Sequence, residues 1–333
     1  MDFELSDEHK MIQQTAREFA QAEIAGDAIE RDEQAKFPAE AVKKLGEMGF
    51  LGMITPEKYH GAGMDMLSYV IALEEIARVD AAVCVIMSVT NSLCQWVINN
   101  FGTDAQKEKY LIPLAEGEVL GAYALSEPQS GSDAAAMRTF AERRGDMYVL
   151  NGTKNWVTNG LSAETYIVFA LTEKGIGHKG VSAFIVEKGW NGFSQGKKED
   201  KLGIRSSDTC ELVFDNCEIP AENLLWKEGK GFHIAMATLD GGRIGIAAQA
   251  LGIGQSALDK SIAYAKEREQ FDKPISQFQA IQFKVAEMTA QMDAARLLTY
   301  RAALAREQKE RCTREAAVAK YYASDAAMRA AQE

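Results

Sequence analysis

The sequence predicts an α+β fold in which helical segments at both ends flank a central β segment. Three observations predict it: helical spacing of apolar residues before about residue 120, β-prone runs between about 121 and 227, and helical spacing again from 228 onwards. The chain has 333 residues, of which 47% are hydrophobic and 26% charged. This composition indicates a globular protein with two or three domains, and it excludes a disordered or collagen-like chain.

Residues 1–120 are predicted to form a helical N-terminal domain. A helical stripe is weak over residues 41–51 and clear over residues 67–77. Residues 81–103 carry no charge over 23 residues, which is long enough to span a bilayer. Because Ser, Thr, Asn and Gln interrupt this segment repeatedly, we interpret it as a buried helix and expect no membrane association.

Residues 121–227 are predicted to form an antiparallel β domain. Residues 165–172, 180–188 and 209–220 are β-prone and read as strands. Two Asn-Gly pairs, at 151–152 and 159–160, predict hairpin turns because Asn and Gly accept positive φ angles.

Residues 228–333 are predicted to form a C-terminal helical bundle. No Gly or Pro interrupts residues 279–333, and the last twenty residues are an Ala-rich helix without a capping signal. We therefore expect the bundle to be incomplete, as in a C-terminally truncated chain.

Charge and cysteine usage exclude several classes of protein. Asp and Glu (48) outnumber Lys and Arg (37), giving a net charge of −11, so nothing favours a nucleic-acid backbone or an anionic membrane. Five cysteines without a C-x-x-C pair argue against a disulfide framework or a zinc site and fit a reducing compartment. The four histidines lack metal-site spacing, and the acidic N-terminus is not a signal peptide. We expect a cytoplasmic protein without a bound metal.

Two short motifs imitate a dinucleotide-binding fingerprint. GIGHKG at 175–180 matches G-x-G-x-x-G, but a strand follows it where the fingerprint requires a helix, so we predict a hairpin loop. LGIGQSA at 251–257 lies inside a helical run, where small residues indicate close helix packing. The sequence contains neither a P-loop nor G-x-S-x-G, so NTP and serine-hydrolase chemistry lack support.

Two other segments can carry chemistry. YALSEPQSGSD at 123–133 offers small hydroxyls and backbone amides suited to a polar heterocycle or a phosphate, although the segment taken alone favours a plain surface loop. NGTKNWVTNG at 151–160 places Trp156 and Thr158 on one face of a strand, where they could cover a flat cofactor. Taken alone, this segment favours a core position for Trp156 over a cofactor contact.

Because of five segments in this order and at these spacings, the chain closely resembles the acyl-CoA dehydrogenase family over residues 1–333. The resemblance is strongest to the bacterial short-chain, butyryl-CoA type. The five segments are YALSEPQSGSD, NGTKNWVTNG, KLGIRSSDTCELVFDNCEIPAENLL, LDGGRIGIAAQALGIGQSALD and YAKEREQFDKPISQFQAIQFKVAEM. The resemblance implies FAD between the β domain and the bundle, an acyl-CoA substrate, an electron-transfer flavoprotein as electron acceptor, and a dimer or tetramer.

The resemblance also assigns roles to residues. Leu125 and Ser126 would bond the flavin ring, and Thr158 would lie near its reactive N5. The full cofactor set would be Tyr123, Leu125, Ser126, Ser132, Trp156 and Thr158, with Arg268, Gln270 and Gln279 reaching the FAD of a neighbouring subunit. Other family members carry Thr or Ser at the position of Gln270.

The substrate would meet Ser132, Asp240 and Arg243. Asp240 and Arg243 stand three residues apart on a predicted helix, so Asp240 can orient the guanidinium toward a thioester. A solvated ion pair is the plainer interpretation of the same spacing.

The family's catalytic base is the Glu of a late I-Y-E-G-T motif, and this motif is absent from the 333 residues. An alternative base position, on the helix of Asp240, is Gly242 here, and the family gives Glu127 no such role. We therefore expect the printed chain to be inactive, as the truncated form of a dehydrogenase whose base lies beyond Glu333. The alternatives are a non-catalytic subunit that binds flavin or CoA thioesters, or serves as a scaffold, and a flavin oxidase or reductase on the same fold.

Overall fold

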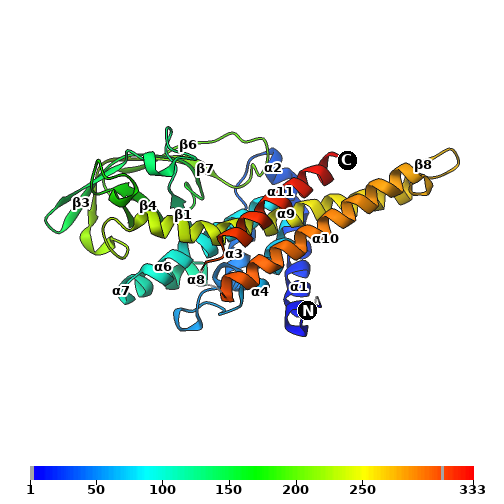
Figure 1. The fold of residues 1–333 in the computed structure, drawn as a ribbon, viewed down its shortest axis with the longest axis horizontal. Helices are drawn as coiled ribbons and strands as arrows, with labels where there is room; N and C mark the ends of the chain where they lie inside the picture. Colours follow the sequence, from blue (N-terminus) through cyan, green and yellow to red (C-terminus); the bar gives the residue numbers. More distant parts are fainter. Residues whose placement is uncertain (1–3, 309–310) are drawn as a thin grey trace. The chain divides into compact units, whose positions relative to one another are not determined.

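The structure is a computed structural model that describes residues 4–308 and 311–333 (Figure 1). Its helices of six or more residues are α1 (Asp7–Phe19), α2 (Ala28–Glu33), α3 (Ala39–Glu47), α4 (Met66–Ala77), α5 (Ala81–Ser88), α6 (Trp96–Phe101), α9 (Gly231–Glu267), α10 (Gln279–Gln308) and α11 (Thr313–Gln332). Two shorter helices are α7 (Asp104–Gln106) and α8 (Ile112–Glu116). The strands are β1 (Gly121–Ala124), β2 (Phe140–Arg144), β3 (Met147–Thr158), β4 (Thr165–Leu171), β5 (Val181–Glu187), β6 (Phe193–Lys198), β7 (Thr209–Pro220), β8 (Glu269–Gln270) and β9 (Lys273–Pro274).

The predicted α+β class is confirmed, with helices before β1, a β segment in the middle and long helices after it. By its internal contacts the chain forms two compact units. The first consists of Met1–Ala28, Asp65–Val85 and Arg243–Glu333, and the second of Ile29–Met64 and Ile86–Gly242. Each unit therefore combines segments that are far apart in the sequence.

In the first unit, α4 is buried on every side. All of its twelve residues are buried, and α1 and α10 both pack against it. The helix begins at Asp65, whose carboxylate accepts a hydrogen bond from the Ser68 amide at 2.6 Å and so satisfies a free donor of the first turn. The apolar residues that predicted this helix, 67–77, lie in its core, which confirms the prediction.

The glycine-rich segment of α9 also belongs to the first unit. A Cβ on Gly252 would lie 2.4 Å from the Glu74 carbonyl oxygen and 2.5 Å from the Ala77 side chain. Only glycine therefore permits this close approach of α9 to α4. The segment is helix packing and not a dinucleotide loop, as the sequence predicted.

The uncharged segment forms one continuous helical run, Ala81–Phe101, whose middle is a π-helical stretch, Val89–Gln95. Its length, and the mean hydropathy of 1.7 over an 18-residue window, would allow it to cross a membrane, but 83% of that 18-residue window is buried inside the protein. Polar residues inside it are used internally: the Gln95 amide donates to the carbonyl oxygens of Leu51 at 2.5 Å and Leu114 at 2.9 Å. These features are typical of a core helix.

The second unit contains a seven-stranded sheet in the order β1-β4-β2-β3-β7-β6, with β5 paired to β4. Most pairs are antiparallel, including β3 with β7 and β4 with β5. The prediction of an antiparallel domain is wrong for β1 and β4, which run parallel, and for the single β2 to β4 pairing. The intervening loop and the β2–β3 hairpin provide the long crossover that a parallel pair requires.

The first Asn-Gly pair does not form the predicted turn. Asn151 and Gly152 lie within β3 at a register shift against β7, where Gly152 adopts φ +147°. The turn between β2 and β3 is instead at Gly145, with φ +62°. Asn159, after the end of β3, also has a positive φ of 62°. Cross-strand pairing with β7 therefore overrides the local turn preference at 151–152.

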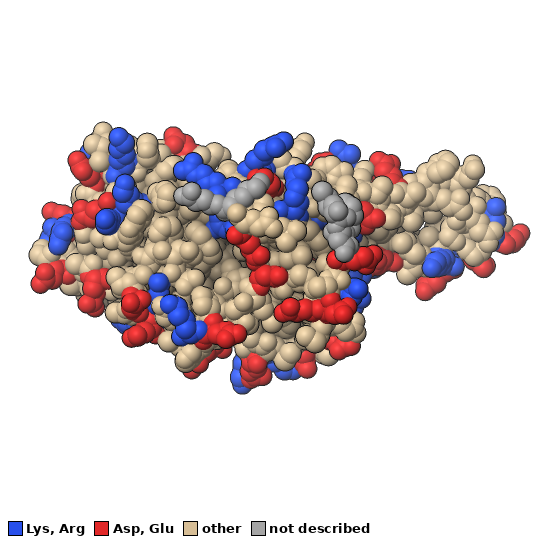
Figure 2. Space-filling view, turned by 60° about the horizontal axis from the view of Figure 1, so that its bottom comes forward, with Lys and Arg blue, Asp and Glu red and all other residues tan. Residues whose placement is uncertain are grey.

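The β4–β5 hairpin contains GIGHKG in its loop, as predicted. Aromatic side chains of the sheet, among them Tyr166, Phe169 and Phe184, are fully buried, and each contributes about 1.5–3 kcal/mol of hydrophobic stabilisation. All five cysteines are buried free thiols. On the face in Figure 2, basic and acidic side chains are intermixed.

Candidate functional site

The polar loop that follows β1 is docked on β3 in the second unit. The Asn155 amide donates to the Ser126 carbonyl oxygen at 2.9 Å. Glu127 and Ser130 exchange two backbone hydrogen bonds of 3.0 Å, which close the loop into a tight turn. The two segments that the sequence selected, 123–133 and 151–160, are therefore brought together.

Trp156 stands beside this loop in an unusual conformation. It lies at a bulge of β3 with φ +62°, a left-handed conformation that a bulky residue rarely adopts. Its side chain is 62% exposed, whereas its neighbour Val157 is fully buried. Because this exposed ring lies next to the polar loop, we treat it as part of a candidate binding surface. The core interpretation of Trp156 is thus wrong.

Free polar groups lie on neighbouring residues of the loop and β3. The hydroxyls of Ser126 and Thr158 make no hydrogen bond within residues 4–308 and 311–333. The Asn155 side-chain oxygen is buried without a partner in the same ranges. A flat heterocycle with donors and acceptors along its edge would satisfy these groups, so the residues present fit a flavin.

Two further predicted residues lie in the same unit. Tyr123 is part of β1, and its ring centroid is 5.0 Å from that of Phe169. Burial raises the pKa of its hydroxyl well above the usual value, so Tyr123 stays neutral. Ser132 is exposed near the end of the loop.

Asp240 and Arg243 lie three residues apart on α9, as predicted. Asp240 is only 5% exposed and Arg243 is half-buried. Buried carboxylates are costly unless they have partners, so Asp240 is well placed to orient a cation on its own helix face.

Arg268, Gln270 and Gln279 are at the turn between α9 and α10 in the first unit (Figure 1). All three are exposed. Backbone pairing in the β8–β9 hairpin holds Gln270, and the Ile275 amide donates to the Arg268 carbonyl oxygen at 2.8 Å, while Gln279 begins α10. Their side chains are thus available to another molecule.

Sequence reasoning missed Lys154. Its side chain is completely buried, and its Nζ lies 2.8 Å from Glu127 Oε1 and 3.0 Å from the Leu125 carbonyl oxygen. The only signal was a lysine inside a β-prone segment.

Glu127 is held from all sides. Besides Lys154, its carboxylate accepts from the amides of Arg138 at 2.6 Å and Thr139 at 3.0 Å, and from the Gln129 side chain at 2.6 Å. Burial alone would raise the pKa of Glu127, but Lys154 and these donors lower it below the usual value. A general base needs the opposite shift, so Glu127 is not one.

Burial lowers the pKa of Lys154 to about 8, despite the opposing attraction of Glu127. The unfolded chain keeps this proton up to about pH 10.5, so between pH 8 and 10.5 the unfolded state binds more protons. The free energy of unfolding should therefore rise with pH across this window, by up to about 3 kcal/mol. Urea unfolding of the wild type and Lys154→Met at pH 7.5 to 10 checks this, and a constant difference between them would contradict it.

A β domain between helical segments carries a polar loop beside an exposed tryptophan, and these residues form the candidate site. Three family descriptions match the chain: acyl-CoA dehydrogenase N-terminal domain (residues 6–118), middle domain (122–217) and C-terminal domain (229–333). The short-chain specific acyl-CoA dehydrogenase of Clostridium acetobutylicum is 50% identical over 98% of this chain and 86% of its own length.

Solved structures agree. Butyryl-CoA dehydrogenase from Megasphaera elsdenii superimposes with a TM-score of 0.97 at 49% identity, over 99% of this chain and 87% of that one. A chain from a structure described as electron transferring flavoprotein of Acidaminococcus fermentans superimposes with a TM-score of 0.98 at 50% identity, over 99% of this chain and 87% of that one. The chain belongs to the acyl-CoA dehydrogenase family of flavoprotein oxidoreductases.

Proposed function

We propose that the protein is an FAD-dependent dehydrogenase of short-chain acyl-CoA thioesters. The observation that carries this proposal is the exposed Trp156 with a positive φ, next to Asn155, whose side-chain oxygen is buried without a partner in the described residues, and near Thr158 in the same strand. The 49–50% identity to short-chain and butyryl-CoA dehydrogenases supports the substrate class.

Bound FAD would supply the acceptor for the hydride that leaves the β-carbon of the thioester. In the proposal, the ring of Trp156 covers one face of the flavin and excludes water from it. Ser126 and Thr158 donate to the ring edge, and the Asn155 oxygen accepts from it. The remaining residues of the proposed flavin site are Leu125, Tyr123 and Ser132. The FAD of a second copy of the chain is contacted by Arg268, Gln270 and Gln279.

On the substrate side, Arg243 supplies a fork of donors and Asp240 fixes its orientation on α9. Ser132 offers a hydroxyl to the CoA arm. The α-proton requires a carboxylate with a raised pKa in a dry site. Glu127 is excluded by its ionised pairing with Lys154, so we assign this step to the I-Y-E-G-T glutamate of the family, which is not among the 333 residues.

We further propose an electron-transfer flavoprotein as the acceptor of the electrons, a homo-oligomer as the assembly and the cytoplasm as the location. The hairpin that carries Arg268 supports the oligomer. Its tip residues, Phe271 and Asp272, both have positive φ, and Phe271 is 86% exposed. An apolar ring on a strained tip suits contact with another subunit.

An absorption spectrum of the purified protein with FAD tests the cofactor, and Trp156→Ala tests the site. Loss of stacking is worth about 1–3 kcal/mol, as for nucleobases on aromatic residues, so FAD affinity should fall about 5- to 150-fold. Trp226→Ala is a matched control in the same unit: Trp226 is 44% exposed, has φ +60° and packs on Phe101 and His233. It should leave FAD affinity unchanged.

A protein without flavin absorbance after incubation with FAD would refute the proposal. Turnover of butyryl-CoA with an artificial electron acceptor then distinguishes a dehydrogenase from the two alternatives, an oxidase and a non-catalytic subunit. Turnover with oxygen alone would indicate an oxidase. Flavin and CoA-thioester binding with no turnover in any chain that includes the family glutamate would indicate a non-catalytic subunit.

A further inference from the structure

We propose that Lys154 and Glu127 are positioning residues that hold the loop after β1 in the conformation that receives the flavin. This inference rests on the proposed function, because it concerns the same site. Neither side chain is placed to touch the cofactor: Lys154 is completely buried and Glu127 is 4% exposed. They act through the backbone of Leu125 and Ser126.

The contacts form a junction of three segments. Lys154 on β3 donates to the Leu125 carbonyl oxygen at 3.0 Å and to Glu127 at 2.8 Å. Glu127 in turn accepts hydrogen bonds from the backbone amides of Arg138 and Thr139, the two residues that directly precede β2. The neighbouring bond from Asn155 to the Ser126 carbonyl fixes the next peptide. The loop, β3 and the start of β2 are therefore tied at one buried point.

Stability alone does not explain this arrangement. A buried ion pair is often no more stabilising than well-packed apolar side chains of similar volume, because both charges lose their hydration. What an apolar pair cannot do is bond the Leu125 carbonyl. That bond sets the direction of the peptide from which Ser126 presents its amide and hydroxyl. The pair is thus suited to fixing a conformation.

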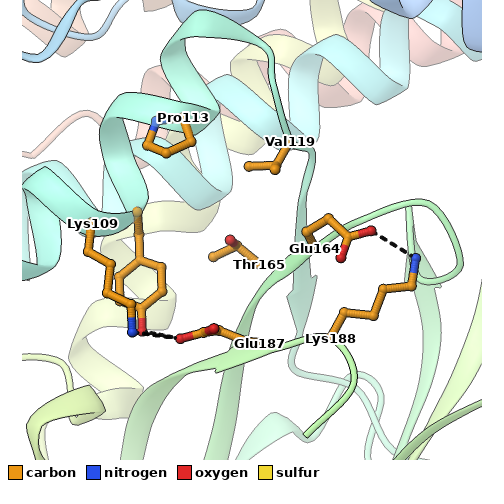
Figure 3. Close-up of a pocket in the computed structure, with 8 residues that line it drawn as sticks. Lys109, Pro113, Val119, Glu164, Thr165, Glu187 and Lys188 are labelled. Atoms are coloured by element: carbon orange, nitrogen blue, oxygen red, sulfur yellow. Dashed lines mark hydrogen bonds and ion pairs between the residues drawn. The ribbon is translucent and has the colours of Figure 1, made fainter.

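The same unit contains a surface counterpart. Lys188 Nζ lies 3.0 Å from the Leu161 carbonyl oxygen and 3.0 Å from Glu164 Oε1, so it also joins a carbonyl to a carboxylate. Its side chain is 34% exposed and that of Glu164 is 51% exposed. Figure 3 shows this pair at a surface pocket lined also by Lys109, Pro113 and Glu187. Lys188→Met is therefore a matched control.

The test compares wild type, Lys154→Met, the double variant Lys154→Met/Glu127→Gln, and Lys188→Met. Three quantities are measured for each protein. They are the FAD affinity, by flavin fluorescence; the rate of amide hydrogen exchange of residues 125–130 in the absence of FAD; and the midpoint of thermal unfolding. Removing Lys154 alone leaves a buried charge, so the thermal midpoint should fall, and neutralising Glu127 should restore part of it.

Because the Leu125 carbonyl still lacks its donor, the double variant should keep about 10- to 100-fold weaker FAD binding and correspondingly faster exchange of the loop. Lys188→Met should change neither. If the double variant binds FAD like the wild type, or its loop exchanges at the wild-type rate, the inference is wrong. A wild type that binds no FAD overturns the proposed function instead, and the exchange measurement then decides whether the pair holds the loop.

Discussion

Replacing Arg296 with Met is expected to lower the free energy of unfolding of the first unit by about 3–5 kcal/mol. The reason is Glu74, whose side chain is 3% exposed in the centre of α4. Arg296 on α10 donates to its Oε1 through Nε at 3.0 Å and Nη2 at 2.9 Å. Without the guanidinium, the hydroxyl of Tyr300 at 3.3 Å remains as a weak donor.

The position of this pair makes the effect large. α4 is buried on all sides, so a carboxylate left without its cation cannot turn to water. Arg296 also bonds Gln255 on α9 at 2.7 Å, and therefore joins three helices of the unit. Removing it breaks several contacts together.

The urea midpoint followed by circular dichroism measures the loss. Arg329→Met is the control: Arg329 pairs with Asp325 at 3.0 Å on α11, but the two side chains are 61% and 48% exposed. Such a pair is worth less than about 1 kcal/mol. If both variants unfolded at the same urea concentration, Glu74 would not depend on Arg296. The double variant Arg296→Met/Glu74→Met should recover much of the stability, because it leaves no unpaired charge.

Replacing Arg243 with Ala is expected to weaken the binding of a short-chain acyl-CoA about 10- to 150-fold, while FAD binding stays unchanged. Losing a hydrogen bond to a charged group costs about 1.5–3 kcal/mol, which gives this range. Arg243 is half-buried on α9, one turn from the buried Asp240. The guanidinium offers several donors in a fixed plane, whereas the residues that we propose to face the flavin are on β1, β3 and their loop.

Titration with butyryl-CoA, followed through the flavin spectrum, measures this affinity. Arg243→Lys keeps the charge but not the planar fork, and it should lie between wild type and Ala. Lys260→Ala removes an exposed cation further along the same helix and should have no effect. Equal affinity in Arg243→Ala and the wild type would mean that Arg243 is only an ion-pair partner of Asp240.

The sequence by itself determined the helical and β zones, the family and the two segments that form the candidate site. Helical spacing over 67–77 is a local property, and α4 forms there. The motifs at 123–133 and 151–160 are likewise local, and their meeting followed from the resemblance to a family.

Only the tertiary structure decided how these segments are held. The Asn-Gly pair at 151–152 lies within β3 and does not form the predicted turn, because hydrogen bonds to β7, a distant strand, outweigh the local turn preference. The parallel pairing of β1 with β4 depends on a crossover that no local pattern encodes. Lys154 looked like an ordinary strand lysine. Its burial against Glu127, 27 residues away, depends on how the loop and β3 are brought together in three dimensions.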